Sequence, residues 1–164
     1  MNDQKKTKQQ LLDELLETRR NLQDTERILA DQQDIREALA KSKQRYRELE
    51  ECMGDWIWEI DAQHLFTYCS PQVKTILGYE PEDILGKHPA DFLTGKDAEI
   101  LPSFLVKLAA EPRIFYGLEA SQRHADGSIR YLEINIIPLF GLDGVLTGFR
   151  GVTRDVTKRK IMAM

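Results

Sequence analysis

Residues 1–53 contain neither proline nor glycine, and this constrains the fold more than any other feature of the sequence. The segment is rich in Gln, Glu, Leu, Lys and Arg and is predicted to form one helix of about 50 residues, roughly 75 Å long. Its apolar residues recur at steps of three and four when Thr18, Thr25, Gln32 and Ser42 are included, which is typical of a coiled-coil seam. The residues predicted to mediate dimerisation through this seam are Leu11, Leu15, Leu22, Leu29, Ile35, Leu39, Tyr46, Leu49 and Met53.

A helix of about 50 residues with so narrow an apolar stripe is not stable alone in water, so it needs a partner helix. The chain offers no second long helix, and we therefore expect a parallel homodimer, with a single solvated helix as the alternative. Between Leu29 and Ile35 the steps are three and three, so one step of four is missing. Such a stammer overwinds a supercoil locally. Together with the polar seam residues, it suits either an element that shifts or a merely adequate dimer.

From Gly54 onward glycine and proline recur, and aromatic and β-branched residues gather in short runs. Ser70 is predicted to cap a helix that ends at Gly78. A longer helix is predicted over 97–110, with its true start near Pro102 because proline disturbs a helix interior. The remaining predicted elements are strands at 55–60, 65–69, 113–123, 128–139 and 145–154, and one-turn helices at 81–85 and 88–92. This order of elements predicts an α+β domain with an antiparallel sheet and its helices on one face.

The composition excludes several classes of protein. A net charge of −4 provides no basic surface for nucleic acid. Two cysteines, Cys52 and Cys69, are too few for a disulfide framework and lack metal-ligand spacing. No apolar run approaches the roughly 18 residues of a membrane span, and the N-terminus lacks the apolar region of a signal peptide. We therefore expect a cytoplasmic location, no membrane span in this chain and no metal site.

Several motifs follow one another along the second part of the chain: WEID at 58–61, YCSP at 68–71, LGYEPEDILGK at 77–87, DFL at 91–93, DG at 126–127 and GVTRDVTKRK at 151–160. In this order they resemble the motifs of PAS sensor domains, in particular the PAS domains of bacterial sensor histidine kinases and related signalling proteins. The resemblance implies a PAS fold, a five-stranded antiparallel sheet of order 2-1-5-4-3 with helices on one face and a cavity beneath them. The expected organisation is a coiled-coil dimerisation helix at 1–53, a PAS domain at 54–158 and the start of an output linker at 159–164.

The cofactor is not specified by the sequence. The resemblance implies that a photoreceptor of this family needs a cysteine near 88–93, where none is present. It also implies that haem-binding members commonly take an axial histidine from the helix predicted at 97–110, which contains none. His88 is either a ligand or a partly buried cap residue. No cofactor or a non-covalent small molecule is expected; flavin remains a candidate, and haem fits less well.

Candidate ligand-binding residues lie in the predicted strands. Trp56 and Trp58 project from one face of their strand and form either core packing or an aromatic wall for a planar ligand. Polar residues inside apolar strand runs face either solvent and a neighbouring strand or a polar ligand. Tyr68 and Ser70 are expected to lie at the mouth of the cavity that the resemblance implies. The candidate set is Trp58, Tyr68, Ser70, Glu119, Asn135 and Arg150.

No catalytic motif is present, so we expect an input module and no enzyme; any kinase or cyclase activity would lie outside these residues. The predicted function is to sense a small molecule or cofactor state and to pass the signal through a dimeric coiled coil to an output domain, such as the histidine kinase of a two-component system. By the resemblance, Asp155 and Thr157 fix the exit of the last strand towards that output. The alternative is a structural dimerisation module that binds no ligand. The sequence specifies neither the ligand nor the output domain, nor whether the chain is a fragment of a longer protein.

Overall fold

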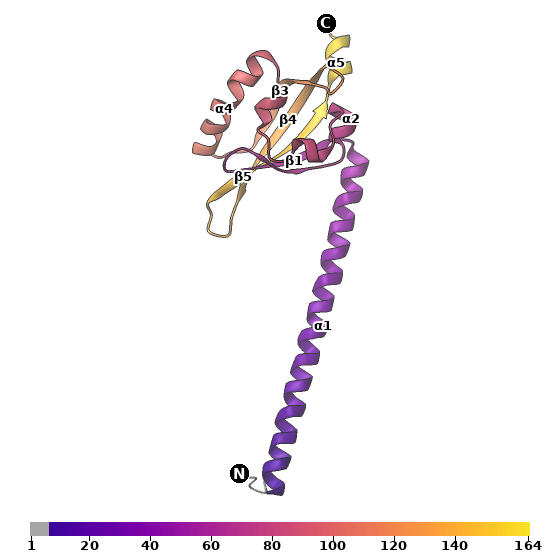
Figure 1. The fold of residues 1–164 in the computed structure, drawn as a ribbon, viewed down its shortest axis with the longest axis vertical. Coiled ribbons are helices and arrows are strands. Elements are labelled where there is room, and N and C mark those ends of the chain that lie inside the picture. The colour runs from indigo at the N-terminus through magenta and orange to yellow at the C-terminus, as the bar shows by residue number, and fades with distance from the viewer. Residues whose placement is uncertain (1–6) are drawn as a thin grey trace. The chain divides into compact units, whose positions relative to one another are not determined.

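The computed structural model describes residues 7–164, and residues 1–6 of the predicted helix lie outside this range. The chain divides into two compact units, Met1–Glu48 and Leu49–Met164. Their boundary falls within α1 (Lys8–Met53), which Figure 1 shows as one uninterrupted helix. The prediction of a long helix is therefore confirmed for the described residues.

The apolar side chains of α1 are open to solvent. Each of the nine predicted seam residues is at least 45 % exposed, with Tyr46 the least exposed and Leu15 the most. Leu12, Leu16 and Ile28 are also exposed, so apolar surface extends beyond the predicted seam. Within residues 7–164, none of the helices combines the length and the hydropathy that a membrane span requires.

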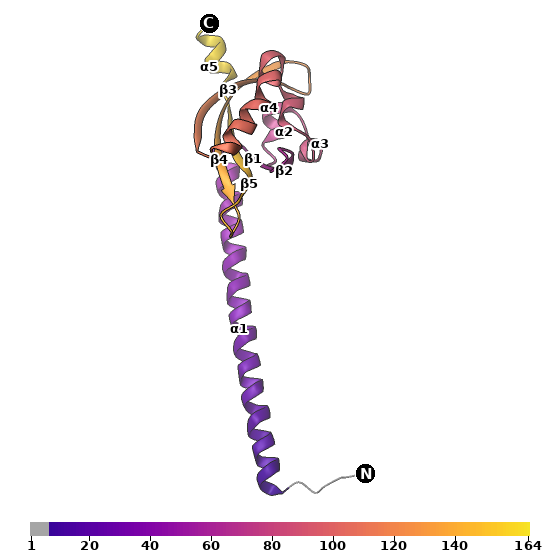
Figure 2. The same cartoon turned by 90° about the vertical axis from the view of Figure 1, so that its left-hand side faces the viewer.

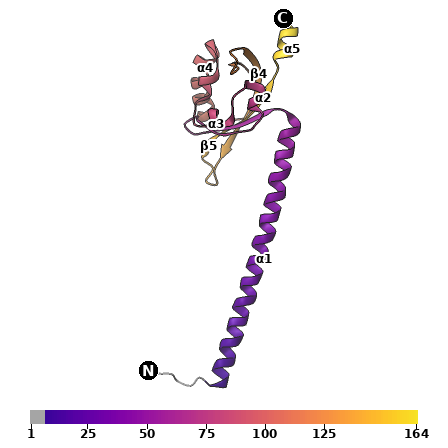
Figure 3. The same ribbon diagram turned by 45° about the vertical axis from the view of Figure 1, so that its right-hand side comes forward.

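The second unit contains one antiparallel sheet, as predicted, and several short helices. Its elements are β1 (Trp56–Asp61), β2 (Phe66–Cys69), α2 (Val73–Leu77), α3 (Pro81–Ile84), η1 (Pro89–Phe92), α4 (Gly95–Ala110), β3 (Phe115–Arg123), β4 (Ile129–Phe140), β5 (Leu146–Asp155) and α5 (Thr157–Met162). The strands lie in the order β2-β1-β5-β4-β3. The helices α2, α3 and α4 lie on one face of this sheet (Figures 2 and 3).

The core lies between the sheet and these helices. Alternate residues of β1, Trp56, Trp58 and Ile60, are at most 5 % exposed and belong to it. Trp58 stands opposite Gly151 of β5. A Cβ at Gly151 would lie 2.0 Å from the Trp58 ring, so only glycine leaves room for the indole to lie against this strand.

Two local predictions were wrong. The helix after Ser70 begins at Val73, with Gln72 as its N-cap. The Ser70 hydroxyl oxygen instead accepts a hydrogen bond from the Ile57 amide at 2.9 Å, because the neighbouring strand offers a buried donor. The helix α4 begins at Gly95, and Pro102 lies in its interior. Proline disfavours a helix interior, but this helix continues through Pro102, and Leu105 and Leu108 in the following turns are buried in the core.

Candidate ligand cavity and strand exit

A small enclosed cavity lies beneath the helices, between the inner face of the sheet and the segment from η1 to α4. Its volume is about 30 Å³, and a cavity of that size holds roughly one or two water molecules. Its lining is apolar except for one glutamine. The lining residues are Trp56, Trp58, Phe66, Pro89, Leu93, Leu101, Leu105, Leu118, Ala120, Gln122 and Ile134.

Gln122 is the polar residue of the cavity. It lies on β3, is 4 % exposed, and is joined through its backbone to Leu93 by an isolated bridge. Its side-chain oxygen Oε1 is buried and has no hydrogen-bond partner among the described residues. An unsatisfied buried acceptor costs about 1–3 kcal/mol. Gln122 is therefore the one lining residue whose side chain carries an acceptor without a partner among the described residues.

The two tryptophans wall the cavity with their rings, while their N–H groups are already used. The Trp58 Nε1 donates to the Thr153 hydroxyl at 2.9 Å, and the Trp56 Nε1 donates to the Cys69 sulfur at 3.1 Å. Burial raises the pKa of the Cys69 thiol to about 11, so the thiol stays protonated at neutral pH. Trp58 thus serves core packing and the cavity wall together.

Arg150 and Asn135 lie on the opposite face of the sheet from the cavity. The Arg150 Nε donates to the Glu59 carboxylate at 2.9 Å, across the β1–β5 pair. Glu59 follows Trp58 in β1, so its side chain points away from the core. The Asn135 side-chain oxygen accepts a hydrogen bond from the Gly117 amide at 2.9 Å and bridges the irregularity at the start of β3.

Tyr68, Ser70 and Glu119 also lie outside the cavity lining. The Tyr68 hydroxyl donates to the Glu50 carboxylate at 3.0 Å, and Glu50 is 5 % exposed near the end of α1. Ser70 is fully buried and bonds to the β1 backbone. Glu119 is bound at 2.8 Å by the ammonium group of Lys160 from α5. Of the six candidates, only Trp58 lines the enclosed cavity.

Thr157 and Asp155 hold α5 where the last strand ends. The Tyr131 amide donates to the Thr157 hydroxyl oxygen at 3.0 Å, and the Thr157 amide donates to the Asp155 carboxylate at 2.9 Å. The Thr157 hydroxyl also donates to the Asp155 carboxylate. These bonds position the first turn of α5 against β4.

Thr157→Ala is expected to loosen α5 without unfolding the sheet. The substitution removes the hydroxyl group that accepts a hydrogen bond from the Tyr131 amide. Such a hydrogen bond contributes about 1 kcal/mol to stability. Hydrogen exchange should therefore be faster at the Tyr131 amide and across 157–162. Lys158→Ala, at an exposed neighbour, is the control and should leave these rates unchanged. Equal protection in both variants would contradict this role of the hydroxyl.

Two of three comparisons with known proteins agree with this geometry. The sequence profile of the PAS domain matches residues 54–158. The PAS domain of a protein from Colwellia psychrerythraea has 26 % sequence identity and a TM-score of 0.63, with coverage of 71 % of this chain and 98 % of that chain. No curated protein matches the sequence at a significant level.

Two further solved structures share the fold at lower identity. One is the N-terminal domain of a diguanylate cyclase with PAS/PAC sensor from Marinobacter aquaeolei, at 19 % identity, a TM-score of 0.58 and coverage of 65 % of this chain and 98 % of that chain. The other is a sensory box histidine kinase/response regulator from Burkholderia thailandensis E264, at 20 % identity, a TM-score of 0.57 and coverage of 73 % and 89 %.

Proposed function

This chain belongs to the PAS domain family, and on that premise we propose that it binds a small molecule in the enclosed cavity and passes the bound state to an output domain. The observation that carries the proposal is the buried, unpartnered side-chain oxygen of Gln122 at the cavity wall. Buried polar groups in folded proteins nearly always have a hydrogen-bond partner. A ligand that donates one hydrogen bond supplies the partner that the described residues lack.

The cavity also limits the class of ligand. Apolar side chains surround Gln122, so the favoured ligand is a small neutral molecule with one donor group and an otherwise apolar surface. Neither flavin nor haem fits in about 30 Å³ while the two tryptophan rings and Phe66 keep their positions. The proposal therefore favours a compact ligand over either cofactor, and Trp58 remains its aromatic wall.

Transmission is proposed to run through a parallel homodimer of α1. The exposure of all nine seam residues supports this proposal, because a single chain leaves this apolar surface in water. The stammer between Leu29 and Ile35 lies in the same seam and weakens its layers. Two packings that differ by a few kcal/mol could then interchange when the cavity is filled.

A structural module that binds no ligand is the second candidate. It is favoured by the small volume of the cavity and by the tryptophan N–H groups, both of which already donate within the protein. The two candidates differ in what occupies the space beside Gln122.

Gln122→Met is expected to abolish ligand retention while the domain stays folded. Methionine preserves the size of the side chain and removes the acceptor, so the ligand loses its hydrogen bond. Native mass spectrometry of the purified parent should show a small adduct that is absent from this variant. Gln63→Met, in an exposed turn, is the matched control and should keep the adduct.

The opposite result is also defined. If no ligand donates a hydrogen bond to Gln122, the parent and the Gln122→Met variant will both have the mass of the chain alone. Removal of the unsatisfied oxygen will then stabilise the variant by about 1–3 kcal/mol. That outcome, measured by urea unfolding, would support the structural module.

A further inference from the structure

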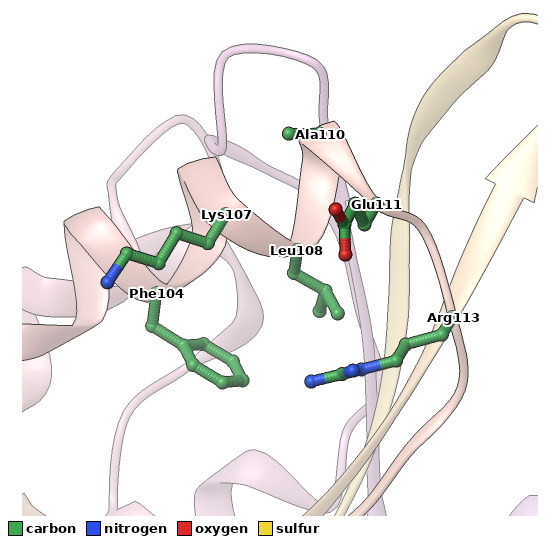
Figure 4. Close-up of a pocket in the computed structure, with 6 residues that line it drawn as sticks. All are labelled: Phe104, Lys107, Leu108, Ala110, Glu111 and Arg113. Atoms are coloured by element: carbon green, nitrogen blue, oxygen red, sulfur yellow. The ribbon is translucent and has the colours of Figure 1, made fainter.

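A second pocket opens on the surface of the domain, where α4 ends and the chain turns towards β3. It has a volume of about 430 Å³ and shares no lining residue with the enclosed cavity. Figure 4 shows its lining: Phe104, Lys107, Leu108, Ala110, Glu111 and Arg113. This pocket can therefore be occupied independently of the cavity beneath the helices.

The floor of the pocket is apolar and held in place. Leu108 is 4 % exposed and belongs to the core. The Phe104 ring packs edge-on against Phe115, with ring centroids 5.2 Å apart and an interplanar angle of 87°. Both side chains are thus fixed from behind, and a small apolar group can rest on them without rearrangement.

The rim carries opposite charges that do not neutralise each other. Among the described residues, the side chains of Lys107, Glu111 and Arg113 make no ion pair or hydrogen bond. Elsewhere in the domain three arginines each bind a carboxylate: Arg150, Arg154 and Arg159. In Figure 4 the Arg113 guanidinium points towards the Phe104 ring, and the Glu111 carboxylate lies beside the end of α4.

Glu111 and Arg113 form no ion pair with each other. Pro112 stands between them, fixes its own φ and excludes the helical conformation at Glu111, where φ is −128° and ψ is 77°. The helix terminus adds a partial negative charge on the side of Glu111. One side of the pocket therefore attracts a cation, and the side of Arg113 attracts a carboxylate.

We propose that this pocket binds a free amino acid with an apolar side chain. The α-carboxylate pairs with Arg113, and the α-ammonium group pairs with Glu111 and the end of α4. The side chain rests on Phe104 and Leu108. Lys107 adds positive charge at the rim, which strengthens the attraction for the carboxylate.

Three ligands of similar shape distinguish an amino-acid site from an apolar surface and from an anion site. L-phenylalanine carries both charges, 3-phenylpropionate lacks the ammonium group, and phenethylamine lacks the carboxylate. Ligand-observed NMR titrations against the full chain should show L-phenylalanine binding more tightly than either analogue. Equal binding of all three ligands would reduce the site to an apolar surface, and tighter binding of 3-phenylpropionate would reduce it to an anion site; either result overturns the proposal.

Variants then assign the contacts. Arg113→Gln should weaken L-phenylalanine binding roughly tenfold or more, as expected for the loss of a charge-assisted hydrogen bond. Glu111→Gln should weaken L-phenylalanine while leaving 3-phenylpropionate unaffected or tighter. Arg123→Gln, at the exposed far end of β3, is the matched control and should bind as the parent does. No detectable binding to the parent, or equal binding by Arg113→Gln and the control, would overturn the assignment.

Discussion

Replacing Leu22 and Leu39 together by aspartate is expected to convert a dimer into monomers. Both residues belong to the predicted seam and are 58 % and 52 % exposed in the single chain, so the fold of each domain does not depend on them. In a paired helix each aspartate would be an unpaired charge in an apolar layer, at a cost of about 3 kcal/mol or more. Size-exclusion chromatography with light scattering measures the change.

The control places the same charge beside the seam. Gln23→Asp with Ala40→Asp adds two aspartates to the same helix, each one residue after a seam leucine. This pair should retain the dimer. A dimer that survived the seam substitutions equally well would show that α1 does not associate through this stripe.

Gly151→Ala is expected to destabilise the domain by about 3 kcal/mol or more. The new methyl group would lie 2.0 Å from the Trp58 ring. The ring cannot move aside easily, because it is buried and its Nε1 is bonded to Thr153. Urea unfolding followed by circular dichroism gives the change in the free energy of unfolding.

Two further variants test the cause of this loss of stability. Gly141→Ala meets chiefly the Asp143 carboxylate, at 2.9 Å, and should cost less, because this exposed side chain can shift at the expense of one hydrogen bond from the Val145 amide. Trp58→Phe should relieve the clash, so its combination with Gly151→Ala should be less destabilising than the sum of the two changes. Additive losses in the double variant would show that the methyl group strains something other than the ring.

Much of the fold could be predicted because its signals are local. Short runs of aromatic and β-branched residues between turn residues located every strand to within two residues, and Gly78 ended its helix as expected. The role of Ser70 and the start of α4 could not be predicted in this way. Both depend on partners distant in the sequence: the Ile57 amide for Ser70, and the core contacts of Leu105 for α4.

The candidate site was harder to predict, because the type of a polar residue in a strand does not indicate on which face of the sheet its side chain lies. Trp58 was found through its spacing from Trp56. Gln122 was missed, although it lies two residues after Ala120 and four after Leu118, which also line the cavity. This period of two was the available signal. It was hidden because a glutamine in a strand ordinarily faces solvent.

The positions of the two tryptophans make their fluorescence a probe of the cavity. Trp56 and Trp58 are the chain's two tryptophans, and both line the cavity. The tryptophan fluorescence of the whole chain therefore originates at the cavity wall, and α1 contributes none. The indole N–H of Trp56 donates to the Cys69 sulfur, and the indole N–H of Trp58 donates to the Thr153 hydroxyl oxygen. A shift in emission wavelength or lifetime on adding a compound would report directly on this wall, without any attached dye.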